Sequence, residues 1–398
     1  SHNVAEVREG LEILQVMPQN VMVADTNGDI FYQRTGRVPI RPAGFDFSRP
    51  VNGSTSRTEW IGLHPTKDLI QVLNPKSGYM QNCNITPDVM MVGSPMEKSL
   101  YPDYIFGQPA MLTHQRGTRA TELLHSNPKI TEQQMMEIAL DQKCYQHERW
   151  VEELDNADAA IHRERSKDYD DAIKRVKAWD GFARRDSNGA LVYYYWRHAL
   201  AELAGKDEIV AMIKKVNNYL DLFGVPDDRS HLAKLGDAHT PTNELARIDE
   251  KEQRLLIEAL EKGAARMRAN HGSLDAVYGD VFRAGRLDYD GDNVSFPVGG
   301  GSLRDEGMAS PRAIDFENER ADHTRWGRGG QTSTEVVILS TPIRSYPQPP
   351  IGQSDHPDSP HFRDQAEKLL GPAKMKPSWF SKNELMDGHV KETVVLQF

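Results

Sequence analysis

The sequence predicts a mixed α+β fold in which a long helical section separates two parts that are rich in strands. Strand-like segments joined by turn residues come first, helical periodicity fills the middle, and strand-like segments return after residue 278. The chain has 398 residues, 38% hydrophobic and 27% charged, which is enough to bury a large core. We expect a sheet-rich part at residues 1–106, a helical section at 107–270, and strands and helices that return to the core at 271–398.

The N-terminal part contains a helix start and a hairpin. Asn3 followed by Glu6 forms a capping-box pattern, which predicts a helix through about Val16. In NVMVADTNGDIFYQ, two apolar-rich segments meet at Asn27-Gly28, and both residues accept the positive φ that a tight hairpin turn requires. TEWIGLHP and LIQVLNPKSGYMQNCN are expected to form further short strands, because turn signals interrupt both.

The middle of the chain is expected to be helical. The runs KITEQQMMEIALDQ, YDDAIKRVKAWDG and RIDEKEQRLLIEALEKGAARMRA place apolar residues three and four apart, which indicates helices with one solvated face. The aromatic run YYYW at residues 193–196 is interpreted as part of a helix core, where the side chains pack, and not as a ligand-binding cluster. Later, VSFPV, TEVVILST and KETVVLQ predict strands, and a helix is expected at about 362–370.

Composition and missing motifs exclude several classes of function. A net charge of −10 and a pI near 5.8 give no overall basic footprint for nucleic acid, although a local patch can escape the average. The two cysteines argue against a disulfide framework or a cysteine-built zinc site. The sequence has no phosphate-binding GxxxxGK[ST], no HExxH and no GxSxG, and no apolar run long enough to span a bilayer. We therefore expect no nucleic-acid partner and no membrane span.

Several loop segments together resemble one family of amide hydrolases. VADTNGDIFYQRTGRVPIRPAGFD, TEWIGLHP and VLNPKSGYMQNCNITP are similar, in order and spacing, to the penicillin acylase, acyl-homoserine-lactone acylase and aculeacin acylase family. KAWDGFARRDSNGALVYYYW resembles the family's WDG segment, and YGDVFR and PVGGGSLR look most like its lactone-acylase branch. GQSDHPDSPHFRDQ and PSWFS resemble its C-terminal signature. The resemblance covers essentially the whole chain.

The resemblance implies a fold and a chemistry. Its members are N-terminal-nucleophile hydrolases with an αββα sandwich, made as a precursor that cleaves itself into two subunits. The large subunit then begins with a serine, whose hydroxyl attacks an amide while its own α-amino group, with a reference pKa of about 7.7–8.0, acts as the base. By resemblance, this chain is the C-terminal part of the large subunit, in a partial sandwich. Its implied substrates are small N-acylated molecules, with acyl-homoserine lactones ahead of β-lactams, and its implied location is periplasmic or secreted.

Two residues match catalytic positions of that family. Asn84 matches the position of an oxyanion donor, a role that suits a side-chain amide because it offers two N–H donors and carries no charge. Asn84 also permits two other interpretations, since it could cap its own turn or belong to the glycosylation sequon Asn84-Ile85-Thr86. Arg116, in QRGTRATELL, matches an arginine that positions and polarises the catalytic groups, and its alternative is a surface charge.

The nucleophile, the partners and the metal are also expectations from the resemblance. Ser1 is interpreted as a boundary serine, because His-Asn-Val follows it where the family usually has asparagine next. The nucleophile is then expected on an N-terminal segment of the large subunit, with a small α subunit from the same precursor as a further partner. No cofactor is required, and the nearest matches to a structural calcium site are Asp103 and the carbonyl of Phe47. The alternative function is a nucleophile-less family member that acts as a binding or assembly subunit.

Overall fold

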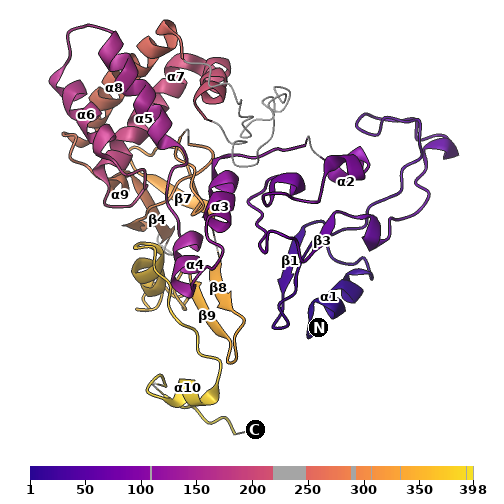
Figure 1. The fold of residues 1–398 in the computed structure, drawn as a ribbon. Helices are drawn as coiled ribbons and strands as arrows, with labels where there is room; N and C mark the ends of the chain where they lie inside the picture. The colour runs from indigo at the N-terminus through magenta and orange to yellow at the C-terminus, as the bar shows by residue number, and fades with distance from the viewer. Residues whose placement is uncertain are drawn as a thin grey trace. The chain divides into compact units, whose positions relative to one another are not determined.

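The computed structural model describes residues 1–107, 110–217, 248–287, 293–305, 307–331, 333–390 and 392–397. Contacts group the chain into two compact units, Ser1–Thr113 and His114–Phe398, and each is described by itself (Figure 1). The mixture of helices and strands confirms the α+β class. The division into three parts stays a prediction.

The first unit begins with the expected helix. Helix α1 spans Val4–Leu11, and the side chain of its N-cap Asn3 accepts a hydrogen bond of 2.9 Å from the backbone N–H of Glu6. The helix ends at Leu11 and not near Val16, because the chain leaves helical geometry at Leu14, where φ is 58°. The start of the helix was therefore confirmed, and its predicted end was wrong.

A three-stranded sheet follows α1. Strands β1 (Asn20–Ala24) and β2 (Ile30–Arg34) form the predicted antiparallel hairpin, and β3 (Gln71–Leu73) pairs with β2 in the order β1-β2-β3. In the turn only Gly28, at φ 91°, has a positive φ, and the Asp25 carboxylate accepts a hydrogen bond of 2.8 Å from the N–H of Asn27. The hairpin was thus predicted correctly, with a longer turn than expected.

TEWIGLHP does not form the predicted strand. It makes one isolated bridge, between Leu63 and Pro39, next to Gly62 at φ 143°. A strand needs a continuous partner, and the neighbouring segment supplies only a few backbone bonds. The rest of the unit consists of loops and short helices: η1 (Ser56–Thr58), η2 (Thr66–Asp68), η3 (Pro87–Val89), η4 (Lys98–Leu100) and α2 (Asp103–Phe106).

The second unit carries the helical section. Its helices are α3 (Gln115–His125), α4 (Glu132–Ala139), α5 (His147–Ala160), α6 (Lys167–Ala178), α7 (Asn188–Val216), α8 (Glu250–His271) and α9 (Tyr278–Val281). Helices α7 and α8 pack side by side, and residues 193–196 are buried in the core between the helices, which confirms their interpretation as packing residues (Figure 1). Trp196 donates its indole N–H to the carbonyl of Leu256 on α8 at 3.0 Å.

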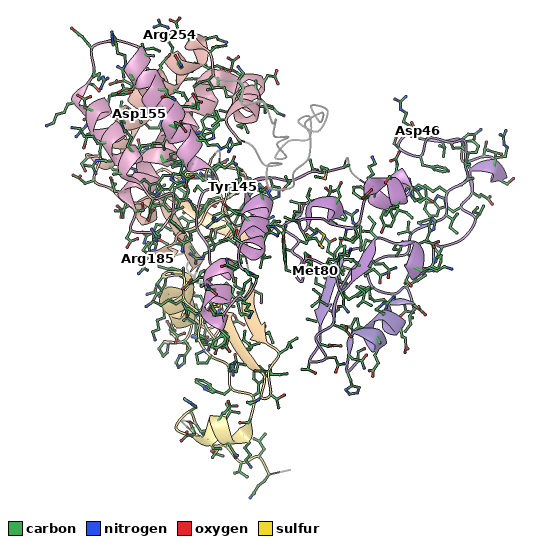
Figure 2. The ribbon with its side chains drawn as sticks, viewed as in Figure 1. Asp46, Met80, Tyr145, Asp155, Arg185 and Arg254 are labelled. Carbon is green, nitrogen blue, oxygen red and sulfur yellow. The ribbon has the colours of Figure 1, made fainter. Side chains whose placement is uncertain are left out.

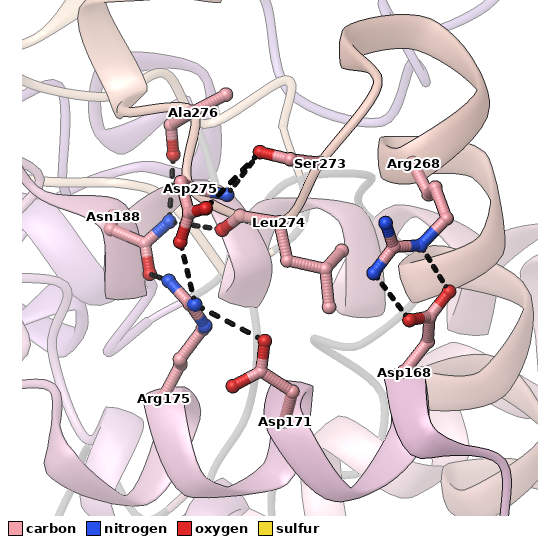
Figure 3. A network of polar contacts seen from close by, with 9 residues as sticks. All are labelled: Asp168, Asp171, Arg175, Asn188, Arg268, Ser273, Leu274, Asp275 and Ala276. Carbon is pink, nitrogen blue, oxygen red and sulfur yellow. Dashed lines mark hydrogen bonds and ion pairs between the residues drawn. The ribbon is translucent and has the colours of Figure 1, made fainter.

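A polar network connects the ends of these helices (Figure 3). The Asn188 side chain at the start of α7 donates to the carbonyls of Leu274 and Ala276, at 2.5 and 2.7 Å, and accepts a bond of 2.6 Å from Arg175 on α6. Arg175 also contacts the carboxylate of Asp275 at 2.8 Å. The segment that follows α8 is therefore held against α6 and α7 by one asparagine and one arginine.

Two sheets complete the second unit. Strands β4 (Phe282–Leu287), β5 (Asn293–Pro297), β6 (Ile314–Phe316) and β7 (Arg325–Gly330) form a sheet in the order β5-β4-β7-β6, in which the β4–β7 pair is parallel and the others are antiparallel. Strands β8 (Thr334–Ile338) and β9 (Arg344–Gln348) form an antiparallel pair. The expected strands around VSFPV and TEVVILST are thus confirmed.

The C-terminal expectations were only partly correct. The helix expected at about 362–370 is present as the π-helix η7 (Ala366–Leu370), and a short helix α10 (Lys382–Met386) follows it. KETVVLQ was predicted as a strand, but residues 392–397 are exposed and have no strand pairing. Among the described helices, none combines the length and the apolar composition that a membrane crossing needs.

Candidate functional site

Asn84 lies in the loop between β3 and η3 of the first unit, the loop that also carries Met80 (Figure 2). Its backbone has a φ of 65°, in the left-handed region, which asparagine tolerates better than most residues. Asn84 is exposed, whereas the next two residues, Ile85 and Thr86, are 4% and 0% exposed. The loop is therefore anchored by buried neighbours and presents the asparagine outward.

A chain of hydrogen bonds joins the backbone of Asn84 to the sheet. The N–H of Asn84 donates to the side-chain oxygen of Asn82 at 3.0 Å, and the Asn20 side chain donates to the same oxygen at 3.4 Å. The Tyr32 hydroxyl on β2 in turn donates to Asn20 at 2.7 Å. Burial raises the pKa of Tyr32 to about 12, so this hydroxyl stays protonated and remains a donor at neutral pH.

The other side of the loop is fixed to residues 111–112. Thr86 and Leu112 exchange hydrogen bonds: the N–H of Thr86 donates to the Leu112 carbonyl at 3.0 Å, and the N–H of Leu112 donates to the Thr86 hydroxyl at 2.9 Å. The Asp88 carboxylate accepts bonds from the Thr86 hydroxyl at 2.5 Å and from the N–H of Met111 at 2.6 Å. A donor on such a loop needs little reorganisation when charge develops beside it.

Sequence reasoning missed the residues that support Asn84. Asn82 could have been found, because an asparagine two residues before a turn commonly accepts a hydrogen bond from that backbone. Thr86 and Asp88 gave no such signal, since their partners at residues 111–112 lie more than twenty positions away in the chain.

Arg116 is the second residue of α3, in the second unit. The helix is capped by His114, whose ring nitrogen accepts a hydrogen bond from the N–H of Gly117 at 3.3 Å. Arg116 is half-buried and so is not an open surface charge. The next arginine on the helix, Arg119, is held in ion pairs with Glu122 at 2.8 Å and Asp141 at 3.1 Å. Asn84 and Arg116 belong to different units, and each is placed only within its own.

The two residues matched to a structural calcium site, Asp103 and Phe47, both lie in the first unit. Asp103 is the first residue of α2, its side chain is 90% exposed, and its carboxylate lies 3.2 Å from the ammonium of Lys98. Calcium typically has six to eight oxygen ligands, and the described residues hold no cluster of three or more His, Cys, Asp or Glu side chains arranged for a metal. Calcium at Asp103 and the carbonyl of Phe47 stays a prediction.

Comparisons with known proteins agree with the resemblance. A family model described as penicillin amidase matches residues 1–387. Penicillin G acylase from Escherichia coli is 32% identical over 124 residues, a match that spans 31% of this chain and 13% of that protein. A solved structure of a thermostable penicillin G acylase from Alcaligenes faecalis, in an orthorhombic form, matches with a TM-score of 0.53 and 16% identity, and covers 100% of this chain and 70% of the other. The structural likeness supports the expected N-terminal-nucleophile hydrolase fold.

Proposed function

Because the chain belongs to the penicillin amidase family, we propose that it contributes the oxyanion-binding loop of an amide hydrolase. The reaction removes the acyl group from a small N-acylated molecule, and the substrates that the resemblance favours are acyl-homoserine lactones ahead of β-lactams. The E. coli and A. faecalis proteins are named penicillin G acylases, which places an acylated amine among the compounds to test first. A periplasmic or secreted location is part of the same proposal.

The observation that carries the proposal is the exposed amide of Asn84 on a loop fixed from both sides. In amide hydrolysis the carbonyl oxygen gains negative charge as the nucleophile adds, and N–H donors already in place stabilise that charge. The backbone N–H of Asn84 donates to the side-chain oxygen of Asn82, which fixes the backbone at this position. An asparagine Nδ2 group is suited to donate to an oxyanion, without the cost of desolvating a charge.

The proposed nucleophile is a serine at the N-terminus of another segment of the same precursor. Its α-amine takes the proton of the hydroxyl as the oxygen adds to the amide carbon, and the proton then passes to the leaving amine as the C–N bond breaks. Water hydrolyses the resulting ester and releases the acid. In this scheme Arg116 positions and polarises the catalytic groups, and no cofactor takes part.

The proposal is tested by substituting Asn84 in the protein expressed from its complete gene. Asn84→Gly is the sharpest variant, because glycine accepts a φ of 65° without strain and removes only the amide. We expect the turnover of an acyl-homoserine lactone or penicillin G to fall by about 10²–10³ with little change in KM. Asn84→Asp keeps the shape and replaces the donor by a carboxylate, so it should lose at least as much activity.

The matched control is Asn52→Gly, which alters an exposed asparagine whose side chain only caps its own turn at Ser54. It should retain full turnover. An Asn84→Gly enzyme as active as the wild type would remove Asn84 from the mechanism. Intact masses and terminal sequences of the co-purifying chains, read in the same preparations, separate the two functions: a chain that begins with serine supports the hydrolase, and folding without any such chain supports the binding or assembly subunit.

A further inference from the structure

A cavity of about 620 Å³ in the second unit is lined by four arginines. We propose that it binds a small organic anion that carries two or more phosphate or carboxylate groups. This inference is independent of the proposed hydrolysis and concerns the region around β7 (Figure 1). The lining residues are Arg304, Phe316, Glu317, Asn318, Arg320, Arg325 and Arg328.

A β-bulge brings two of these arginines to the same cavity. In the β6–β7 pair, Phe316 lies opposite Gly327 and Asp315 lies opposite Gly329, so Arg328 is an extra residue without a partner on β6. Side chains alternate along a regular strand, and positions 325 and 328 would then point to opposite faces. A bulge resets this alternation and redirects a side chain. Arg325 and Arg328 consequently line one cavity.

The side chain of Arg325 is held in one position by three contacts. It is 8% exposed, its guanidinium lies 2.5 Å from the carboxylate of Asp305, and it donates to the Tyr194 hydroxyl at 3.1 Å. A third bond, of 2.9 Å, runs from its Nε to the carbonyl of Glu317. The position of this guanidinium is therefore set by the fold before any ligand arrives.

Arg320 is also held in place. It lies in the loop between β6 and β7, where its N–H donates to the Thr324 carbonyl at 2.9 Å. Its guanidinium stacks over the Trp326 ring, 4.8 Å from the centroid, and contacts the Glu317 carboxylate at 3.0 Å. Stacking leaves the edge of a guanidinium open for further hydrogen bonds.

The remaining two arginines supply unbalanced charge. Arg304 and Arg328 are exposed, and neither guanidinium has a hydrogen-bond or ion-pair partner within the described part of the chain. Among the residues that the structure describes, Asp305 and Glu317 are the two carboxylates that contact the four arginines, so in this part of the chain the arginines outnumber their carboxylate partners by two. This concentration of positive charge contrasts with the net charge of −10 of the whole chain.

The form of the cavity indicates the class of ligand. Guanidinium groups match the geometry of carboxylate and phosphate oxygens in pairs of parallel hydrogen bonds. A volume of about 620 Å³ lies within the range of pockets for small organic molecules and exceeds what one inorganic ion fills. Two separate guanidiniums that have no partner among the described residues therefore favour a ligand with more than one acidic group.

Isothermal titration calorimetry on the intact protein tests the proposal, with pyrophosphate and citrate as probes at low ionic strength. We expect saturable binding of at least one probe and weaker binding as salt is added. The double variant Arg304→Ala, Arg328→Ala should bind about tenfold to a hundredfold more weakly. Its thermal midpoint should be unchanged, because neither guanidinium has a partner among the residues that the structure describes.

Two further variants sharpen the test. The double variant Arg304→Lys, Arg328→Lys keeps the positive charges but lacks the planar guanidinium donors that form paired hydrogen bonds. Its affinity should therefore fall between those of the wild type and the alanine variant. Arg254→Ala removes an exposed arginine of α8, labelled in Figure 2, whose one ion-pair partner in the described part of the chain is Glu250, and it should bind as the wild type does.

Each outcome bears on the proposal. Tighter binding of pyrophosphate assigns the site to phosphorylated ligands, and tighter binding of citrate assigns it to polycarboxylates. Equal binding supports the shared oxyanion chemistry. The proposal is wrong if neither probe binds, if the alanine variant binds as tightly as the wild type, or if Arg254→Ala weakens binding as much as the double variant does.

Discussion

Gly263 on α8 packs directly against the backbone of α7, and Gly263→Ala tests the packing there. A Cβ added at this position on α8 would lie 2.7 Å from the carbonyl oxygen of Tyr195 and 2.9 Å from the backbone nitrogen of Trp196 on α7. Ordinary contacts of a Cβ begin near 3.4 Å, so the helices would have to separate by about 0.7 Å. The contacted atoms belong to the backbone and cannot rotate away.

Two opposing terms set the expected magnitude. Alanine in the middle of a helix is favoured over glycine by about 1 kcal/mol. Overpacking costs about 1–3 kcal/mol, and the upper end applies here because the clash is with backbone and Trp196 is also hydrogen-bonded to α8. We therefore expect Gly263→Ala to lower the free energy of unfolding by about 1–2 kcal/mol, measured by urea denaturation with circular dichroism.

The same substitution at Gly10 is the matched control. Gly10 lies in α1, and a Cβ there would have no atom within 4 Å. Gly10→Ala should raise the stability of the first unit by about 0.5–1 kcal/mol. The packing argument would be refuted by a Gly263→Ala protein as stable as the wild type, or by equal effects of the two variants.

Two other perturbations address ionic and polar contacts of α7. Hydrogen bonds from Arg266 hold the pKa of Glu202 at about 2, so this carboxylate contributes stability above its ordinary pKa of 4.5 that is lost as the pH falls toward 2. Glu202→Gln should therefore show a shallower loss of thermal midpoint across that window, and a loss as steep as that of the wild type would contradict this assignment. Asn188→Ala should cost about 2–3 kcal/mol, because two backbone carbonyls and Arg175 lose a partner, and a change below about 0.5 kcal/mol in urea denaturation would contradict it (Figure 3).

Local signals in the sequence were sufficient for the elements that depend on local interactions. The side chain of Asn3 caps α1 through a residue three positions away, and Gly28 turns the β1–β2 hairpin. Helices α4, α6 and α8 of the second unit needed only their own periodicity. Each of these contacts joins residues close in the chain, so a short window of sequence contains both partners.

The two failed strand predictions depended on a distant partner. TEWIGLHP and KETVVLQ have the composition of strands, but a strand forms only where another strand offers a continuous row of hydrogen bonds. Leu63 finds one bridge to Pro39, and residues 392–397 have no strand pairing. The early end of α1 at Leu11 has a local cause, because the backbone leaves helical geometry at Leu14 although the apolar pattern continues past the last helical residue.

The same distinction explains how much of each candidate site was visible in the sequence. The resemblance to the acylase family selected Asn84, but the bonds that fix its loop join Asn20 to Asn82 and Thr86 to Leu112, across 62 and 26 positions. Similarly, the sequence gives no sign that four arginines within 25 residues share a cavity. On a regular strand, side chains alternate between the two faces, and Arg325 and Arg328 would then lie on opposite faces of β7. One extra residue in β7, at Arg328, changes which side chains converge. The residue types in a site can thus follow from sequence, while their convergence depends on pairing and register, so substitutions of Asn84 test the chemistry and those of Arg328 test the geometry.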